Sequence, residues 1–64
     1  MDYREHIQIN SEIRFGKPCI KGTRIAIYDI LSWLSEGMSI REIISDFPQL
    51  REGDILATLA YSEY

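Results

Sequence analysis

The segment SIREIISDFP, residues 39–48, carries the most complete helix signal in this chain. Ser39 and Glu42 form an S-x-x-E pair, in which each side chain can accept a hydrogen bond from the other residue's backbone N–H group. Pro48 marks the end, because the residue before a proline disfavours helical backbone angles. The segment therefore predicts a short helix with one apolar face. That face comprises Ile40, Ile43, Ile44 and Phe47, at i, i+3, i+4 and i+7.

Helices are also predicted on both sides of this segment. The preceding helix stops near Gly37, a common residue just past a helix C-terminus. The following helix has a weakly specified start, since Arg51 is a poor cap and Asp54 a better one. The two apolar patterns are Ile27, Ile30, Leu31 and Leu34 in the first of these helices and Ile55, Leu56, Leu59 and Ala60 in the second.

The first 25 residues predict an extended arm rather than a helix. Asn10-Ser11-Glu12 supplies turn chemistry, and Gly16 and Gly22 interrupt the chain further on. A short β-hairpin is expected, lying on the body or against another subunit, because an isolated hairpin is marginal in water. In a strand register, Ile7, Ile9, Ile13 and Phe15 would line one face of it.

These elements predict a single domain over residues 1–64. Its class is mainly α, with an extended basic arm at 1–25 and a helical body at 26–64. Two short helices joined by a turn and braced by a preceding helix outline a helix-turn-helix unit. Any three-helix mini-bundle shares that outline, so DNA binding does not follow from it alone.

Length and composition limit what can stabilise the chain. The chain has 64 residues, of which 45% are apolar. This composition is ordinary for a globular protein, but a chain of this length can form only a small core. One cysteine excludes an internal disulfide, and a single histidine leaves no convincing zinc ligand set. Self-association, with a dimer favoured, is therefore the expected source of extra stability.

Neither a membrane nor a secretory route is expected. No apolar run approaches the roughly 20 residues that a membrane-spanning helix needs. The N-terminal residues MDYREHIQ lack the apolar region of a signal peptide, so a cytoplasmic location is expected.

The net charge of −3 hides a strong asymmetry. Residues 1–28 carry a net charge of +2, and residues 29–64 carry −5. The third helix offers mostly acidic, hydroxyl and apolar side chains, whereas a major-groove reader usually offers Arg, Lys, Asn or Gln. The basic residues are the better DNA candidates, although they can equally form a solvated loop or pair with the acidic body. The candidates are Lys17, Lys21, Arg24, Arg41 and Arg51.

The sequence contains no recognisable set of catalytic residues, and we expect no catalytic activity, cofactor or metal. His6 stands near an N-terminus expected to be mobile, with no nucleophile placed beside it. Cys19 is best interpreted as a small buried apolar residue, with a reactive thiol as the alternative. The glycines at 16 and 22 do not match a phosphate-binding loop, which needs G-x-x-x-x-G-K-[ST].

Large amphipathic side chains predict a protein interface. A chain this small cannot bury all of its aromatic residues, which are enriched at interfaces. Taken one at a time, Tyr28 and Trp33 can each cap the small core as readily as they can belong to an interface. The expected partner or dimer surface comprises Ile7, Ile9, Phe15, Trp33, Tyr61 and Tyr64.

The run GKPCIKGTRI, residues 16–25, closely resembles a prokaryotic family of small antitoxin-like proteins. This is a domain-of-unknown-function family, treated as VapB-like and often encoded beside a PIN-like toxin. The similarity continues through GMSI at 37–40, FPQL at 47–50 and LAY at 59–61. Two positions depart from the family pattern: Arg51 stands where Thr or Ser is usual, and Gly53 where an acidic residue is usual.

The resemblance implies a dimeric, homeodomain-like helix-turn-helix body with a short N-terminal β element. It also implies an antitoxin-like function, namely binding a PIN-like ribonuclease toxin and possible binding to the protein's own operator DNA. Two alternatives stay open on the residues themselves. One is a stand-alone helix-turn-helix regulator, and the other is a self-assembling structural protein with no nucleic-acid role.

Overall fold

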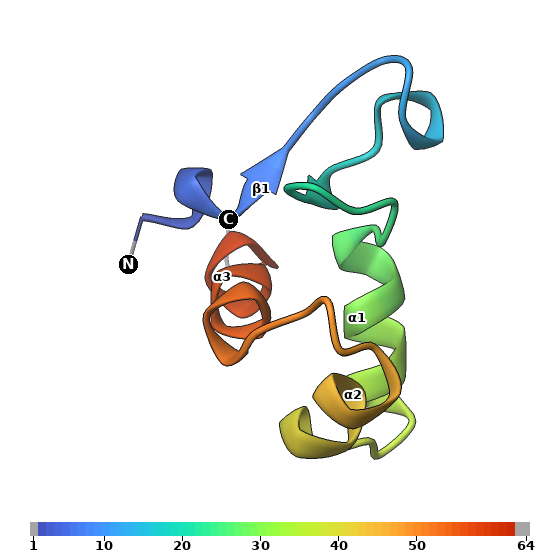
Figure 1. Cartoon of the computed structure of the whole chain (residues 1–64), viewed down its shortest axis with the longest axis vertical. Coiled ribbons are helices and arrows are strands. Elements are labelled where there is room, and N and C mark those ends of the chain that lie inside the picture. Colours follow the sequence, from blue (N-terminus) through green and yellow to red (C-terminus); the bar gives the residue numbers. More distant parts are fainter. Residues whose placement is uncertain (1, 63–64) are drawn as a thin grey trace.

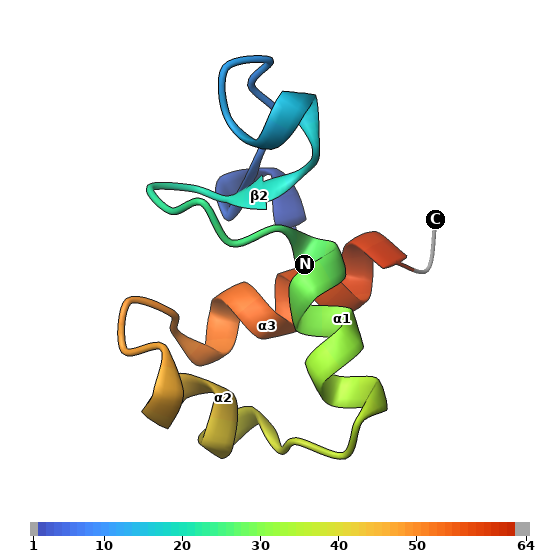
Figure 2. The same cartoon turned by 90° about the vertical axis from the view of Figure 1, so that its right-hand side faces the viewer.

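A computed structural model of the chain describes residues 2–62. Within them the protein is mostly helical, with three α-helices and a two-stranded antiparallel sheet. The hairpin lies over one end of the helices, and α2 lies at the other end (Figures 1 and 2). In chain order the elements are η1 (Tyr3–Glu5), β1 (Ile7–Gln8), η2 (Arg14–Gly16), β2 (Cys19–Ile20), α1 (Ile27–Ser35), α2 (Ile40–Asp46) and α3 (Glu52–Ser62).

The ends of α2 confirm the signals at residues 39–48. The Glu42 backbone N–H donates to Ser39 Oγ at 3.1 Å, and the Ser39 N–H donates to Glu42 Oε1 at 3.0 Å. This reciprocal pair satisfies two N–H groups that a helix N-terminus otherwise leaves unpaired. The helix ends at Asp46, just before Phe47 and Pro48. The sequence thus predicts both ends of α2 correctly.

The C-terminus of α1 also follows its local signal. Gly37 has φ +98°, the left-handed conformation that glycine adopts without a steric penalty. Its N–H donates to the Leu34 carbonyl at 3.0 Å, and the Met38 N–H donates to the Trp33 carbonyl at 3.1 Å. These two bonds make a complete Schellman motif. They turn the chain from α1 toward α2.

The start of α3 differs from the expectation for its cap. The helix begins at Glu52, so Asp54 is its third residue rather than its cap. From there the Asp54 carboxylate Oδ2 accepts the Arg51 backbone N–H at 2.9 Å. An aspartate at this position also complements the positive end of the helix dipole. The weak cap at Arg51 is therefore compensated from inside the first turn.

The hairpin is confirmed, but its strands are not those that the apolar parity indicates. β1 pairs with β2 through Ile7 opposite Ile20 and Gln8 opposite Cys19, so Ile13 and Phe15 belong to neither strand. Only Ile7 of the expected face is buried, and Phe15 is 98% exposed. The run from Asn10 to Gly16 forms turns instead, because their local hydrogen bonds satisfy the backbone without a strand partner.

The core lies where the three helices and the hairpin meet. α3 packs against α1, α2, η1 and β1, so it is surrounded on several sides (Figure 2). Cys19 is buried, as expected, and its thiol donates to the Lys17 carbonyl at 3.3 Å. The core cluster comprises Ile7, Ile20, Ile27, Ile30, Ile43, Leu50, Ile55 and Ala57.

Within residues 2–62, none of the helices has both the length and the apolar character required to cross a membrane.

Candidate functional site

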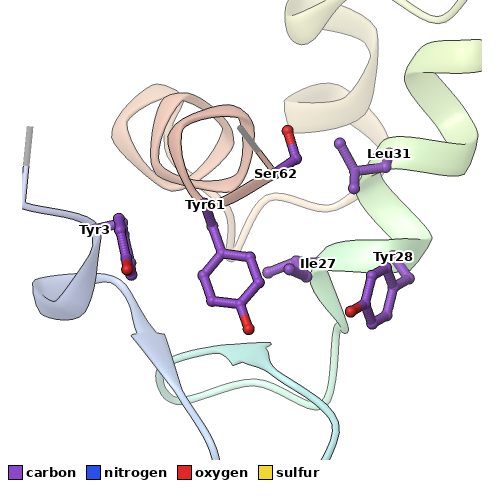
Figure 3. A pocket seen from close by; sticks show the side chains of 6 residues that line it. All are labelled: Tyr3, Ile27, Tyr28, Leu31, Tyr61 and Ser62. Atoms are coloured by element: carbon purple, nitrogen blue, oxygen red, sulfur yellow. The ribbon is translucent and has the colours of Figure 1, made fainter. Parts of the chain in front are cut away.

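One hollow on the surface is a groove lined in part by three tyrosines (Figure 3). It has a volume of about 450 Å³ and lies between η1, the first turns of α1 and the end of α3. Tyr3 and Tyr61 meet edge to face, with ring centroids 5.3 Å apart and planes at 85°. Such a lining offers apolar area together with hydroxyl groups, which suits a protein partner. The lining residues are Tyr3, Ile27, Tyr28, Leu31, Tyr61 and Ser62.

The outward side of α3 carries two apolar residues of the pattern that predicts this helix. Leu56 is 41% exposed and Leu59 38%, whereas Ile55 is fully buried. The helix packs through Ile55, Ala57 and Thr58, and its neighbours are α1, α2, η1 and β1. The apolar pattern that predicts this helix therefore does not coincide with its buried side. Exposed leucines suit protein contact and offer no hydrogen bonds to base edges.

All five basic candidates are exposed, and none makes an ion pair within the described residues 2–62. Three of them, Lys17, Lys21 and Arg24, lie in the hairpin half of the molecule. Arg41 is on α2 and Arg51 directly precedes α3, so these two lie toward the other end. The structure thus places three of the five in the hairpin half and the other two in the helical half.

Arg14, also in the basic arm, has a different role from its neighbours. Its Nη1 donates to the Arg24 carbonyl at 2.9 Å and to Asp29 Oδ2 at 3.1 Å. Asp29 Oδ2 also accepts the Ala26 N–H at 3.2 Å, so a single carboxylate anchors the arm and caps α1. Arg14 therefore fixes the arm to the body. Its sequence context gives no sign of this, since the partner lies 15 residues away.

The expected interface residues fall into different environments. Ile9 and Phe15 are exposed, while Ile7 packs into the core of its own chain. Trp33 is partly buried and stacks on Phe47, with ring centroids 4.4 Å apart and planes at 9°. Tyr61 lines the groove in Figure 3, and Tyr64 lies outside the described residues.

Sequence reasoning missed several residues of this surface. Tyr3 and Leu31 line the groove, and Leu56 and Leu59 are exposed on α3, but none of the four was in an expected site. No local signal identifies Tyr3, because its neighbour Tyr61 is brought to it only by tertiary packing. Within residues 2–62, no three His, Cys, Asp or Glu side chains gather where they could hold a metal ion.

Comparison with known proteins places this chain in a protein family. Residues 7–62 match the model of the family described as "Protein of unknown function (DUF433)". The chain belongs to this family.

The chain is similar to one protein of known structure and to one protein by sequence. A crystal structure of a DUF433 member protein from Anabaena variabilis is 28% identical, with a TM-score of 0.85, over 89% of this chain and 56% of that one. The uncharacterized protein y4eO of Sinorhizobium fredii is 28% identical over 60 residues. Those residues are 94% of this chain and 27% of y4eO, so this chain spans about a quarter of that relative's length.

Proposed function

We propose that this chain is an antitoxin-like protein-binding module with a helix-turn-helix, homeodomain-like body, and that its partner is a PIN-like ribonuclease toxin. One observation carries the proposal. The outward side of α3 presents Leu56 and Leu59 to solvent, and Ser62, one turn after Leu59, lines the tyrosine groove. Apolar helix positions three residues apart share one side of the helix. Similarity of residues 16–25 to antitoxin-like proteins supports the choice of partner.

The mechanism that follows is steric and electrostatic. Exposed leucines and tyrosines would exclude water from the contact, which is where apolar burial stabilises a complex. Exposed arginines at the rim would face the carboxylates that line a metal-dependent nuclease site, since charged groups at a rim steer association. Arg51, directly before α3, is the nearest cation in sequence to the leucine face. The nuclease would be inhibited because its site is covered.

Co-purification with the product of the adjacent gene tests this proposal. A tagged chain should retain that protein and suppress its nuclease activity. The double variant Leu56→Gln/Leu59→Gln should lose both effects and stay folded, because glutamine is a good helix former and both positions are exposed. Ile9→Gln, an exposed apolar residue on the hairpin loop, is the matched control. Retention without inhibition, or equal inhibition by the double variant, would contradict the proposal.

A DNA-binding regulator is the second candidate function. The observation in its favour is the group of three exposed, unpaired cations Lys17, Lys21 and Arg24 in the described hairpin half. Cations of this kind contact phosphates and give affinity that falls with salt. A gel shift on the protein's own upstream DNA at two salt concentrations tests it. Replacement of all three by alanine should abolish DNA binding. An affinity for DNA that does not change with salt concentration would argue against binding through phosphate contacts.

A further inference from the structure

Charge in this molecule is separated along its long axis. Residues 12–24, which form the hairpin end, carry four basic side chains and one acidic, a net of +3. Residues 36–54, which run from the end of α1 through α2 to the start of α3, carry five acidic side chains and two basic, a net of −3. Figure 1 places these segments toward opposite ends of the longest axis. The protein therefore has one basic and one acidic end.

The basic end presents a bulky apolar side chain from a strained turn. Arg14 and Phe15 have φ values of +52° and +60°, a conformation that costs L-residues about 1–2 kcal/mol each. The turn is held by the Gly16 N–H to the Ile13 carbonyl at 3.1 Å and by the two hydrogen bonds of Arg14 Nη1. Phe15 is 98% exposed, so packing of its own side chain within the chain does not compensate the strain. Strain retained in a well-anchored turn points to a contact outside the chain.

The acidic end carries a groove that suits such a side chain. It lies between α2 and the start of α3, has a volume of about 330 Å³, and is lined by Ile40, Arg41, Ile44 and Glu52. A cavity of roughly 150 Å³ lined by aliphatic residues is enough for a benzene ring. The two isoleucines supply an apolar surface, and the lining also holds one charge of each sign, Arg41 and Glu52, of which Glu52 can pair with a cation that accompanies the ring.

We propose that two copies of this chain associate side by side and antiparallel, so that Phe15 of each copy enters the Ile40–Ile44 groove of the other. This arrangement sets each basic end against an acidic end. A two-fold axis repeats the contact and closes the assembly, because residue i of one copy meets residue j of the other and the reverse. Lys17, two residues from Phe15, would approach Glu52 at the rim of the groove.

The size of the molecule is compatible with this dimer. A standard protein interface covers about 800 Å² on each partner, which is about a fifth of this chain's 4370 Å² surface. With extents of 29 × 22 × 18 Å, two copies lying side by side present their long faces to each other. The inference goes beyond the proposed function and does not depend on it. It has one consequence for DNA binding, because the dimer and DNA would compete for Lys17 and Lys21.

A charge-swap experiment on the purified chain tests the proposal. One variant reverses the basic end, Lys17→Glu/Lys21→Glu, and the other reverses the acidic end, Glu36→Lys/Asp46→Lys. All four side chains are exposed and in none of the ion pairs of the described residues, so both variants should fold as the wild type by circular dichroism. Glu42 is left unchanged because it caps α2.

Sedimentation should find the wild type dimeric at low ionic strength and increasingly dissociated as salt is added. Each reversed variant alone should dimerise at least about tenfold more weakly, since like charges then face each other. An equimolar mixture should recover the dimer, because both contacts of the mixed pair become attractive. A monomeric wild type, a mixture that stays monomeric, or assembly that grows beyond two copies would overturn the proposal.

Phe15→Ser provides a second test that leaves the charges unchanged. It should weaken the wild-type dimer and the mixed dimer alike, by at least about tenfold if Phe15 anchors the interface. Leu56→Gln, at an exposed apolar residue of α3 outside both charged segments, is the control and should leave both dimers intact. If the Phe15→Ser variant dimerised as strongly as the wild type, Phe15 would not lie in the interface, and its proposed insertion into the groove would be wrong.

Discussion

His6 Nδ1 lies 2.9 Å from the Asp54 carboxylate Oδ1, so a hydrogen bond joins residues 48 positions apart in the chain. His6 lies between η1 and β1, and Asp54 is in the first turn of α3. Both side chains are partly buried, with 29% and 14% of their surfaces exposed. The contact fixes the N-terminal segment, which the sequence suggested to be mobile, against the helix that lies at the centre of the fold.

The first prediction concerns this contact. His6→Ala should lower the free energy of unfolding by about 1–2 kcal/mol, because it removes a hydrogen bond to a partly buried carboxylate. Urea denaturation followed by Trp33 fluorescence measures the change. Arg4→Ala, which removes the exposed pair with Asp2, is the control and should have no measurable effect. Equal stability of the His6→Ala variant would show that the contact does not hold the N-terminus.

The second prediction concerns the glycine beneath the histidine ring. A Cβ at Gly53 would stand 3.1 Å from His6 Cε1, which is tighter than ordinary contact. Alanine is favoured over glycine in helices by up to about 1 kcal/mol. Gly53→Ala should therefore give little or no stabilisation in the wild type, because the anchored ring opposes it, and should stabilise a His6→Ala background. A double-mutant cycle measures the difference, and identical effects in the two backgrounds would contradict the steric account.

The third prediction concerns the cap of α2. Ser39→Ala should cost about 1 kcal/mol of stability, as for other helix caps. The Ser39 backbone N–H holds the pKa of Glu42 below its usual value of 4.5. Because the folded pKa is depressed, the charged Glu42 stabilises the fold fully above the ordinary pKa, and this contribution is lost as the pH falls through the folded value.

Glu42→Gln isolates the charge in that cap, because glutamine can still accept the Ser39 N–H group. The wild type should therefore be the more stable protein near neutral pH, and the difference should vanish in acid below the folded pKa. Urea midpoints across a pH series measure this. A difference that persists unchanged in acid would show that the carboxylate charge is not its source.

The fourth prediction concerns the strained turn. Phe15→Gly should raise the stability of the monomer by up to about 1 kcal/mol, because glycine adopts φ +60° without the steric penalty that phenylalanine has. The same variant should dimerise less. Ile9→Gly is the control: Ile9 has no positive φ, so glycine there only frees the unfolded chain and should destabilise. A loss of stability on Phe15→Gly would show that the turn stores no strain.

Much of the helical architecture could be predicted from residues close together in the chain. The Ser39–Glu42 pair and Gly37 identified their helix ends, because each satisfies backbone groups within one turn of itself. The candidate site was less predictable. The exposed cations were identified, but the leucine face of α3 was not, because an apolar helix pattern does not say which neighbours will cover it.

The sequence by itself determined both ends of α2, the C-terminus of α1, that a hairpin precedes the helices, and that charge differs between the two halves. Tertiary structure alone decided the register of Ile7 opposite Ile20, the bond between His6 and Asp54, and the exposure of Leu56. The physical reason is the separation along the chain of the residues that interact. Caps and turns are hydrogen bonds between residues at most a few positions apart, whereas packing depends on which elements the whole chain brings together.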